Sequence, residues 1–419
     1  MRVLLKKIYL SEPGLICCAG RNKDELYRSC ITGNKSGMII RKLAEGGNFP
    51  TGQIQCREIP PVELPVQSMA YTNACYTTDT RLIRIIDKAL EQMRPTIEKA
   101  IAVYGHEKIG VCLGSCDNGS EGSLLGHREF FTGGSFPEDY RLYFQSASFP
   151  AEYIALKFGL KGPVFTVATA CASGASAIMR GAELIRAGFC SAVIAGGADV
   201  VSETVLMGFH ALEAVSNSPT NPLSKNRKGI NLGEGAAFFL LDSDGSHLNG
   251  CSHPYGCVEL LGAGESADAY HMTAPGPDGA GPAKAMKTAI MEAQITPSQI
   301  DYINLHGTGT DLNDKAEAFA LRDVFGETIP HVSSTKPIMG HTLGAAGALE
   351  TAVCWMVLKE QKGLPVHCWD GDWDEEFPSL PVVSLSGDEQ PVPVQISTCM
   401  TNSFAFGGCN VSLILGNRT

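Results

Sequence analysis

Cys171 occupies a setting in which a cysteine acts as a nucleophile. It follows the apolar run 163–168 and precedes residues 177–186, whose apolar positions have helical spacing. The pattern therefore predicts a cysteine at a strand-to-helix turn. The first backbone N–H groups of a helix are unpaired and its dipole is positive there, so we expect a thiolate near neutral pH. For this segment alone, an inert buried cysteine is the ordinary alternative.

Two histidines favour the nucleophile over the inert cysteine. His306 ends the segment 301–306 and precedes Gly-Thr-Gly-Thr, whereas His341 follows a glycine and precedes the small-residue run 343–348. Each histidine stands where a predicted strand gives way to glycines. Such settings are as unusual as that of Cys171, and their presence in the same chain indicates a catalytic site.

The order Cys171, His306, Lys336 and His341, with the segment 402–410 near the C-terminus, resembles the β-ketoacyl-acyl-carrier-protein synthases. It is similar to the elongating type of this family, which belongs to the thiolase superfamily. The resemblance covers essentially the whole chain. It implies an α/β thiolase fold, in which two fused similar halves form five alternating layers of helix and sheet.

The chain also contains an internal repeat. Residues 163–188 and 331–358 both read as a strand, a turn with a candidate catalytic residue and a helix rich in Gly and Ala. Small residues crowded onto both helices predict that the helices are buried and closely packed, as two fused copies of one α/β unit require. On the family resemblance, we expect the nucleophile half at 1–250 and the histidine half at 251–419.

The resemblance implies an acyltransferase that forms carbon–carbon bonds, a 3-oxoacyl-acyl-carrier-protein synthase. Malonyl-carrier protein would lose carbon dioxide and condense with an acyl group held on Cys171. His306 and His341 are expected to direct neutral ring N–H groups at the malonyl thioester carbonyl and to stabilise the enolate. The backbone N–H groups of Cys171 and Phe406 are implied to hold the acyl oxyanion, and Phe406 is also implied to be a gate.

Other site residues are expected by the same resemblance. Lys336 is implied to pair with Glu350 beneath the site and to orient the histidines. A solvated pair at a helix start is the alternative for Asp314 and Glu317. The supporting candidates are Glu350, Asp314, Glu317, Thr308, Thr310 and Phe404, and the substrate-binding candidates are Asp117, Gly407 and Gly408.

Asp117 bears on the substrate. It stands where fatty-acid elongating relatives commonly have an apolar or very small residue that lines the acyl pocket. An unpaired carboxylate there disfavours a plain alkyl chain, because a buried charge without a partner is costly. We therefore hypothesise an aromatic, polyunsaturated or oxygenated acyl group, as in aryl-polyene pathways. The alternative is that Asp117 turns away into a turn with Asn118 and Ser120.

Composition and charge limit the partners and the compartment. The 419 residues are 44% hydrophobic and 18% charged, which is typical of a soluble globular protein, and no apolar run reaches membrane-spanning length. A net charge of −11 argues against nucleic acid. The fifteen cysteines are scattered without a C-x-x-C pair, so neither a zinc site nor a disulfide framework is indicated. We expect a cytoplasmic protein without metal or cofactor.

The implied partner is an acyl carrier protein loaded with acyl or malonyl groups. Carrier proteins are acidic, so a local basic patch must oppose the repulsion between two negative proteins. The candidates for this patch are Arg81 and Arg84, or Lys225, Arg227 and Lys228. A homodimer is the default expectation, and a heterodimer with a chain-length factor is the alternative.

Other functions are weighed against an independent synthase. One is a ketosynthase subunit that is active only with a chain-length-factor partner, and it would keep the same residues. A non-catalytic chain-length factor usually lacks the nucleophile, which Cys171 supplies. A thiolase would use a second cysteine near the C-terminus, and Cys409 is the candidate. The segment 402–410 fits the synthase pattern better, although Ala405 stands where the family usually has Gly and Cys409 where it usually has Thr.

Overall fold

Strands from both ends of the chain join in one hydrogen-bonded path. The computed structural model describes residues 6–417 except 43–46, 56–64, 67–75, 78, 118, 139, 249–256 and 385–394. Within these residues the strand order is β13 (His331–Ser333), β12 (Tyr302–Asn304), β14 (Thr398–Phe404), β15 (Cys409–Asn417), β11 (Val258–Ala267), β1 (Tyr9–Leu10), β10 (Gly235–Asp242), β9 (Ala192–Asp199), β7 (Ile109–Gly114) and β8 (Val164–Val167), with β2 (Gly14–Cys17) also paired to β10.

The path is one 11-stranded sheet that narrows at β1, and we call its two parts on either side of β1 the two sheets. Only two residues of β1 connect β10 to β11, and both of these pairings are antiparallel. Strands β9 and β10 are buried along their whole length. Continuous apolar strands of this kind are expected where helices cover both faces of a sheet.

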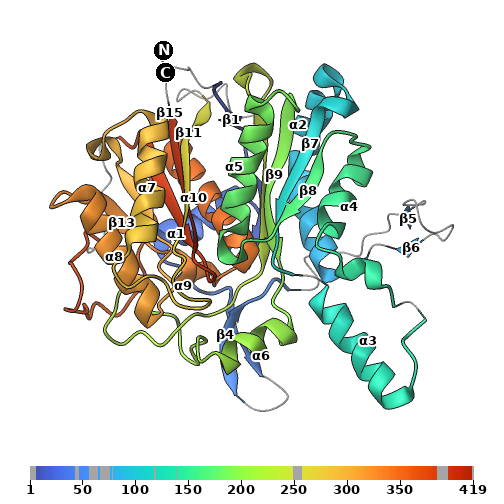
Figure 1. The fold of residues 1–419 in the computed structure, drawn as a ribbon, viewed down its shortest axis with the longest axis horizontal. Helices are drawn as coiled ribbons and strands as arrows, with labels where there is room; N and C mark the ends of the chain where they lie inside the picture. The colour runs from blue at the N-terminus through green and yellow to red at the C-terminus, as the bar shows by residue number, and fades with distance from the viewer. Residues whose placement is uncertain are drawn as a thin grey trace.

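Helices form three layers around the two sheets (Figure 1). One outer layer contains α2 (Arg81–Tyr104) and α4 (Phe149–Phe158), the central layer contains α5 (Ser173–Arg186) and α10 (Ala346–Glu360), and the other outer layer contains α7 (Ala280–Ala293) and α8 (Asp311–Phe325). Buried apolar side chains fill the spaces between the layers. This is the five-layer α/β arrangement that the resemblance predicted.

Smaller elements surround these layers. They are α1 (Lys23–Thr32), α3 (Ser120–Gly133), α6 (Glu203–Ala211), α9 (Lys336–Met339) and the paired strands β3 (Met38–Lys42) with β4 (Asn48–Gly52) and β5 (Pro65–Val66) with β6 (Tyr76–Thr77). Helix α3 projects away from the layered body (Figure 1). No helix of the described residues is long and apolar enough to cross a membrane.

The internal repeat predicted from the sequence is present in the structure. Ala170 precedes α5 and Leu343 precedes α10, and both have a left-handed backbone, with φ of 48° and 50°. Helix α5 closely approaches the turn before α10. A Cβ added to Gly174 would lie only 2.7 Å from the Gly344 carbonyl oxygen, so no larger residue fits there. Helix α5 begins at Ser173, earlier than the apolar spacing predicted. Small residues therefore bring the two turns together.

The cysteines differ in one respect from the sequence prediction. No disulfide framework was expected, yet Cys257 is disulfide-bonded. The other cysteines of the described residues, Cys171 among them, are free thiols.

Candidate active site

Cys171 lies in a short 3-10 turn between β8 and α5, where the sequence predicted a strand-to-helix turn. Its Sγ is 3.0 Å from Nε2 of His341, and the backbone N–H of Phe406 donates a hydrogen bond to it. The side chain is buried. The thiol is therefore within proton-transfer distance of an imidazole and next to a backbone donor.

The acidity of Cys171 differs from the sequence expectation. Burial raises the pKa of the Cys171 thiol to about 12, although the Lys336 charge and the Phe406 backbone N–H lower it. Desolvation thus outweighs the helix-start environment on which the prediction of a near-neutral thiolate depended. Burial therefore favours the neutral thiol of Cys171 over the thiolate.

His306 and His341 face each other across the site. Their ring centroids are 5.4 Å apart and their planes are almost perpendicular, at 83°. One ring nitrogen of each histidine and Cys171 Sγ all lie within 4.8 Å of one another. Burial and the positive charge of Lys336 hold the pKa of both imidazoles well below the ordinary value. Both rings are therefore neutral near pH 7.

These three atoms are also ligand types that zinc prefers. Among the described residues, they form a group of histidine, cysteine and acidic side chains close enough to hold a metal ion. The absence of a metal cofactor stays a prediction.

Lys336 begins α9 and lies below the two histidines. Its Nζ is 2.6 Å from Glu350 Oε1 and 3.5 Å from His306 Nδ1. An ammonium group has only donors, so Nδ1 of His306 accepts and its proton must be on Nε2. Burial raises the pKa of Glu350 to about 7, while Lys336 lowers it. The pair fixes a histidine tautomer that presents an N–H group.

Two acids hold the backbone around His306. Glu317 accepts hydrogen bonds from the backbone N–H groups of His306 at 2.9 Å and Gly307 at 2.8 Å. Asp314 accepts from the backbone of Gly309 at 3.1 Å and of Leu223 at 2.8 Å. Both carboxylates are buried. The solvated helix-start pair weighed from the sequence is therefore wrong, and burial excludes it.

A cavity of about 470 Å³ opens at Cys171. The predicted site residues in its wall are Cys171, His306, His341, Thr308, Thr310, Phe404 and Phe406. The Phe406 ring lies 5.8 Å from the Phe209 ring. Gly407 and Gly408 do not contribute to the wall, so their assignment as substrate-binding residues is not supported. Their φ angles of 85° and 75° show that they shape the turn between β14 and β15.

Cys409, the candidate second cysteine of a thiolase, lies outside this cavity. It starts β15 and is only partly buried. Burial raises the pKa of the Cys409 thiol. Cys409 is also not part of the cluster formed by Cys171, His306 and His341. Among the described residues, the geometry therefore places one cysteine beside the two histidines and not two.

Asp117 lines a second cavity of about 430 Å³ that does not include Cys171. Its carboxylate accepts hydrogen bonds from the Gly119 backbone at 3.0 Å and from the Ser120 backbone and hydroxyl. The carboxylate is therefore not unpaired, and the argument against alkyl chains from an unpaired charge fails. Of the predicted turn, Ser120 takes part, whereas Asn118 lies outside the described residues.

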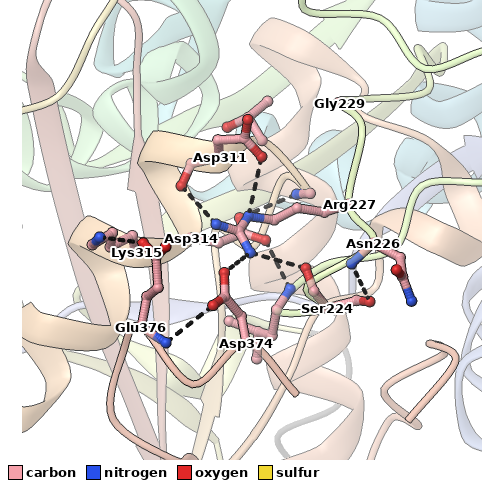
Figure 2. Close-up of polar contacts among 12 residues, drawn as sticks. Ser224, Asn226, Arg227, Gly229, Asp311, Asp314, Lys315, Asp374 and Glu376 are labelled. Atoms are coloured by element: carbon pink, nitrogen blue, oxygen red, sulfur yellow. Dashed lines mark hydrogen bonds and ion pairs between the residues drawn. The ribbon is translucent and has the colours of Figure 1, made fainter. Parts of the chain in front are cut away.

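Most of the basic candidates for carrier docking already have acidic partners. Arg81 pairs with buried Glu234, and Arg84 with Asp79. Figure 2 shows Arg227 enclosed by acids: it contacts Asp374, and its Nε is 3.6 Å from Asp311 Oδ1.

The two lysines of this set are less constrained. Lys225 lies 3.6 Å from Asp372 on the surface. Lys228 is exposed at the rim of the Cys171 cavity and has no ion pair among the described residues. Lys228 is therefore the basic candidate that is best placed to meet an anion entering this cavity.

Sequence reasoning missed Asp199, the last residue of β9. Its buried carboxylate accepts hydrogen bonds from Ser115, Cys116, Asp117 and Gly344. Burial, with the nearby Asp117 charge, raises its pKa to about 7. An acid at the end of the apolar strand 192–198 was the available sequence signal, but the sequence alone does not show which backbone it meets.

Two family models match the chain. Residues 80–247 match the model described as Beta-ketoacyl synthase, N-terminal domain, and residues 257–368 match Beta-ketoacyl synthase, C-terminal domain. The chain is also 30% identical over 428 positions to 3-oxoacyl-(acyl-carrier-protein) synthase 2 of Coxiella burnetii, with 98% of each chain covered.

Solved structures of similar proteins cover the chain almost completely. A chain in the complex of the ketosynthase ApeO with its chain length factor ApeC from Xenorhabdus doucetiae is 35% identical, with a TM-score of 0.86 and coverage of 99% of this chain and 98% of that one. The ishigamide ketosynthase/chain length factor gives 26% identity, a TM-score of 0.84 and coverage of 99% and 100%.

Proposed function

The chain belongs to the β-ketoacyl synthase family, and from this premise we propose how its residues perform the condensation. It is an acyltransferase that forms carbon–carbon bonds, a 3-oxoacyl-acyl-carrier-protein synthase of the thiolase fold. The observation that supports the residue roles best is the placement of Cys171 Sγ 3.0 Å from His341 Nε2, with His306 opposite.

In the loading step, Cys171 takes the acyl group from a carrier thioester. The thiol attacks the thioester carbonyl as His341 Nε2 receives its proton, because the buried thiol is not ionised at rest. The backbone N–H groups of Cys171 and Phe406 hold the tetrahedral oxyanion. The bond between the acyl carbon and the carrier sulfur then breaks, and the departing carrier thiolate takes the proton that His341 had received from Cys171.

In the condensation step, malonyl-carrier protein loses carbon dioxide. Neutral His306 donates its Nε2–H group to the thioester oxygen, which carries the enolate charge, and neutral His341 donates there in the tautomer that carries the proton on Nε2, which is not the tautomer that receives the Cys171 proton during loading. The enolate carbon attacks the acyl carbon on Cys171, the bond from that carbon to Sγ breaks, and the 3-oxoacyl product leaves on its carrier. The Cys171 thiolate then takes up one proton and the thiol is restored.

A two-stage mass measurement tests this proposal. The purified protein is mixed with acyl-loaded carrier protein, and the intact mass should increase by the acyl group, mapped to Cys171. Malonyl-loaded carrier is then added, and the adduct should disappear as 3-oxoacyl-carrier forms. A Cys171→Ala variant should give neither signal, and an adduct on another residue would overturn the assignment.

The proposed partners are an acyl carrier protein and a second subunit. The complexes of ApeO with ApeC and of the ishigamide proteins each join a ketosynthase to a chain length factor. This similarity favours a ketosynthase subunit that works with a chain-length factor over a homodimer. Native mass spectrometry of the protein, expressed alone and with a chain-length-factor gene from the same genome, should show a heterodimer that loads acyl groups faster than the single chain.

The acyl group is proposed to be aromatic, polyunsaturated or oxygenated. This proposal comes from the family resemblance alone, since the hydrogen bonds of Asp117 remove the earlier argument from an unpaired charge. Loading from saturated, polyunsaturated and aryl acyl-carrier donors tests this assignment. Equal rates with saturated chains would contradict it.

The domain division and the compartment are also proposals. We place the halves at 1–250 and 251–419, supported by the repeated left-handed turn at Ala170 and Leu343. A cytoplasmic location is supported by the free thiol of Cys171 and of most other described cysteines. Limited proteolysis near residue 250 tests the first, and cell fractionation tests the second.

A further inference from the structure

The Asp199 carboxylate links the turn after β7 to the turn that follows His341. From the turn after β7 it accepts the Ser115 hydroxyl at 2.8 Å and the backbone N–H groups of Cys116 at 3.0 Å and Asp117 at 2.8 Å. From the turn that follows His341, it accepts the backbone N–H of Gly344. The Asp199 side chain is 1% exposed, so these donors satisfy it and water does not.

The turn at 115–117 contacts the backbone next to Cys171 through Cys116 and lines the second cavity through Asp117. Cys116 Sγ lies 3.0 Å from the carbonyl oxygen of Ala170, the residue before Cys171. Asp117 lines the second cavity, whereas Cys171 lines the first. If the acyl group on Cys171 extends into the second cavity, it must pass along this turn.

The contact between the two turns leaves no room for adjustment. A Cβ added to Gly344 would lie 2.6 Å from Asp199 Oδ2 and 2.8 Å from the backbone nitrogen of Cys116. In such close packing, a displacement of one turn moves the shared carboxylate and with it the other turn. The turn after His341 and the turn at 115–117 are therefore packed as one unit around the Asp199 carboxylate.

We propose that Asp199 is a positioning residue that couples the acyl chain lying along Ser115–Asp117 to the placement of His341. This inference rests on the proposed function, because the acyl chain must first be held on Cys171. The ionised carboxylate suits this role because it has acceptor sites for all four donors and, unlike an amide, no N–H group. An Asn side chain would place its NH₂ group against at least one of these backbone N–H groups. That hydrogen bond would be lost, and the turn that made it would no longer be held to the other.

Asp199→Asn tests the proposal by comparing two chain lengths in two separate steps. Enzyme acylated on Cys171 with an acetyl group or with a long acyl group is mixed with malonyl-loaded carrier, and single-turnover condensation is followed. Wild type should condense the long chain faster. In the variant, condensation of the long chain should fall about tenfold or more relative to condensation of the acetyl group, so that the preference is lost, whereas any loss in loading, which also uses His341 Nε2, should be the same for both chains.

Controls separate coupling from general damage to the fold. Asp242→Asn removes another buried carboxylate, on β10, whose hydrogen bonds to Tyr104 and Asp244 lie outside both turns, and its preference should match wild type. Ser115→Ala removes a single donor to Asp199, so it should shift the preference in the same direction by less, and it decides the question if Asp199→Asn does not fold.

Two results would overturn the inference. One is a long-to-short condensation ratio in Asp199→Asn, or in Ser115→Ala, equal to that of wild type. The other is a wild-type enzyme that condenses both chains equally. Failure of the proposed function looks different, because wild-type Cys171 would then take up no acyl group at all.

Discussion

Lys336 Nζ lies 2.6 Å from Glu350 Oε1, and both side chains are only 1% exposed. The same ammonium group is 3.5 Å from His306 Nδ1. An ion pair this deeply buried contributes little net stability, because desolvation of both charges offsets their attraction. The pair instead acts on His306. The Lys336 ammonium donates to Nδ1 of His306, so the ring proton is on Nε2.

Lys336→Met is expected to lower both stability and activity. It leaves Glu350 as a buried carboxylate without its cation, which costs about 3–5 kcal/mol of unfolding free energy. The double variant Lys336→Met with Glu350→Gln should recover most of that loss in urea denaturation. Condensation should stay low in both variants, since His306 has lost its donor. Recovery of activity in the double variant would show that the pair acts only on stability.

His306→Ala is expected to separate the two half-reactions. Loading needs Cys171 and His341, which are 3.0 Å apart, so the acyl adduct should still form. Condensation should fall about 100-fold, because one of two proposed N–H donors to the enolate oxygen is gone. Quenched single-turnover assays measure the rates of loading and of condensation separately. Equal losses in loading and condensation would argue against a role confined to the enolate.

Local patterns in the sequence predicted the features that depend on neighbouring residues. The turn at Cys171 and the small-residue helices that follow the two turns are features of this kind, because strand, turn and helix periodicity are read within about 20 residues. The five-layer fold came from the family resemblance and not from these patterns. The structure adds the reason for the small residues, which is the close approach of Gly174 to the turn at Gly344.

Features that depend on distant residues were not predictable in the same way. Asp199 meets donors from two separate turns, and Arg81 is paired with Glu234, which lies far away in the chain. The pKa of Cys171 depends on how completely the fold buries it, and the helix start alone gave the wrong direction. Burial and long-range partners are properties of the folded chain.

His367 is expected to make stability fall at acidic pH. It is buried, Nδ1 accepts from the Ser334 backbone at 3.1 Å, and Nε2 faces the Pro222 carbonyl oxygen at 3.0 Å. Burial lowers its pKa from 6.5 to about 4. A base with a lowered folded-state pKa gives its full stability above pH 6.5 and loses it as pH falls through 4, in total on the order of 3 kcal/mol.

His367→Gln isolates this contribution. Glutamine has an acceptor and a donor for the same two backbone groups but does not titrate. Urea denaturation at a series of pH values should show a shallower loss of unfolding free energy between pH 6.5 and 4 than in wild type. An unchanged slope would assign the pH dependence to other buried groups, such as His306 and His341.

Cys409→Thr is expected to keep the activity. Cys409 lies outside the cavity of Cys171, and family members usually have threonine at its position. Loading and condensation should therefore stay near the wild-type rates. Loss of condensation with loading intact would instead indicate a thiolase-like second thiol. Cys171→Ala, which removes the proposed nucleophile, is the matched comparison and should abolish both steps.

The alkylation rate of Cys171 is expected to keep rising with pH. Burial raises its pKa to about 12, so the thiolate fraction should increase about tenfold for each pH unit between about 7 and 9. Iodoacetamide labelling, mapped to Cys171 by mass spectrometry, should follow this slope without a plateau. Cys171→Ala identifies any labelling at other thiols.

A plateau would reverse the account of the nucleophile. If labelling levels off near neutral pH, Cys171 is already a thiolate in the resting enzyme, as the helix start predicted. His341 would then have no proton to receive during loading, and His341→Ala should leave the loading rate unchanged. If labelling keeps rising, the thiol must be deprotonated during attack. His341→Ala should then slow loading, because its Nε2 lies 3.0 Å from Sγ and is the base in place.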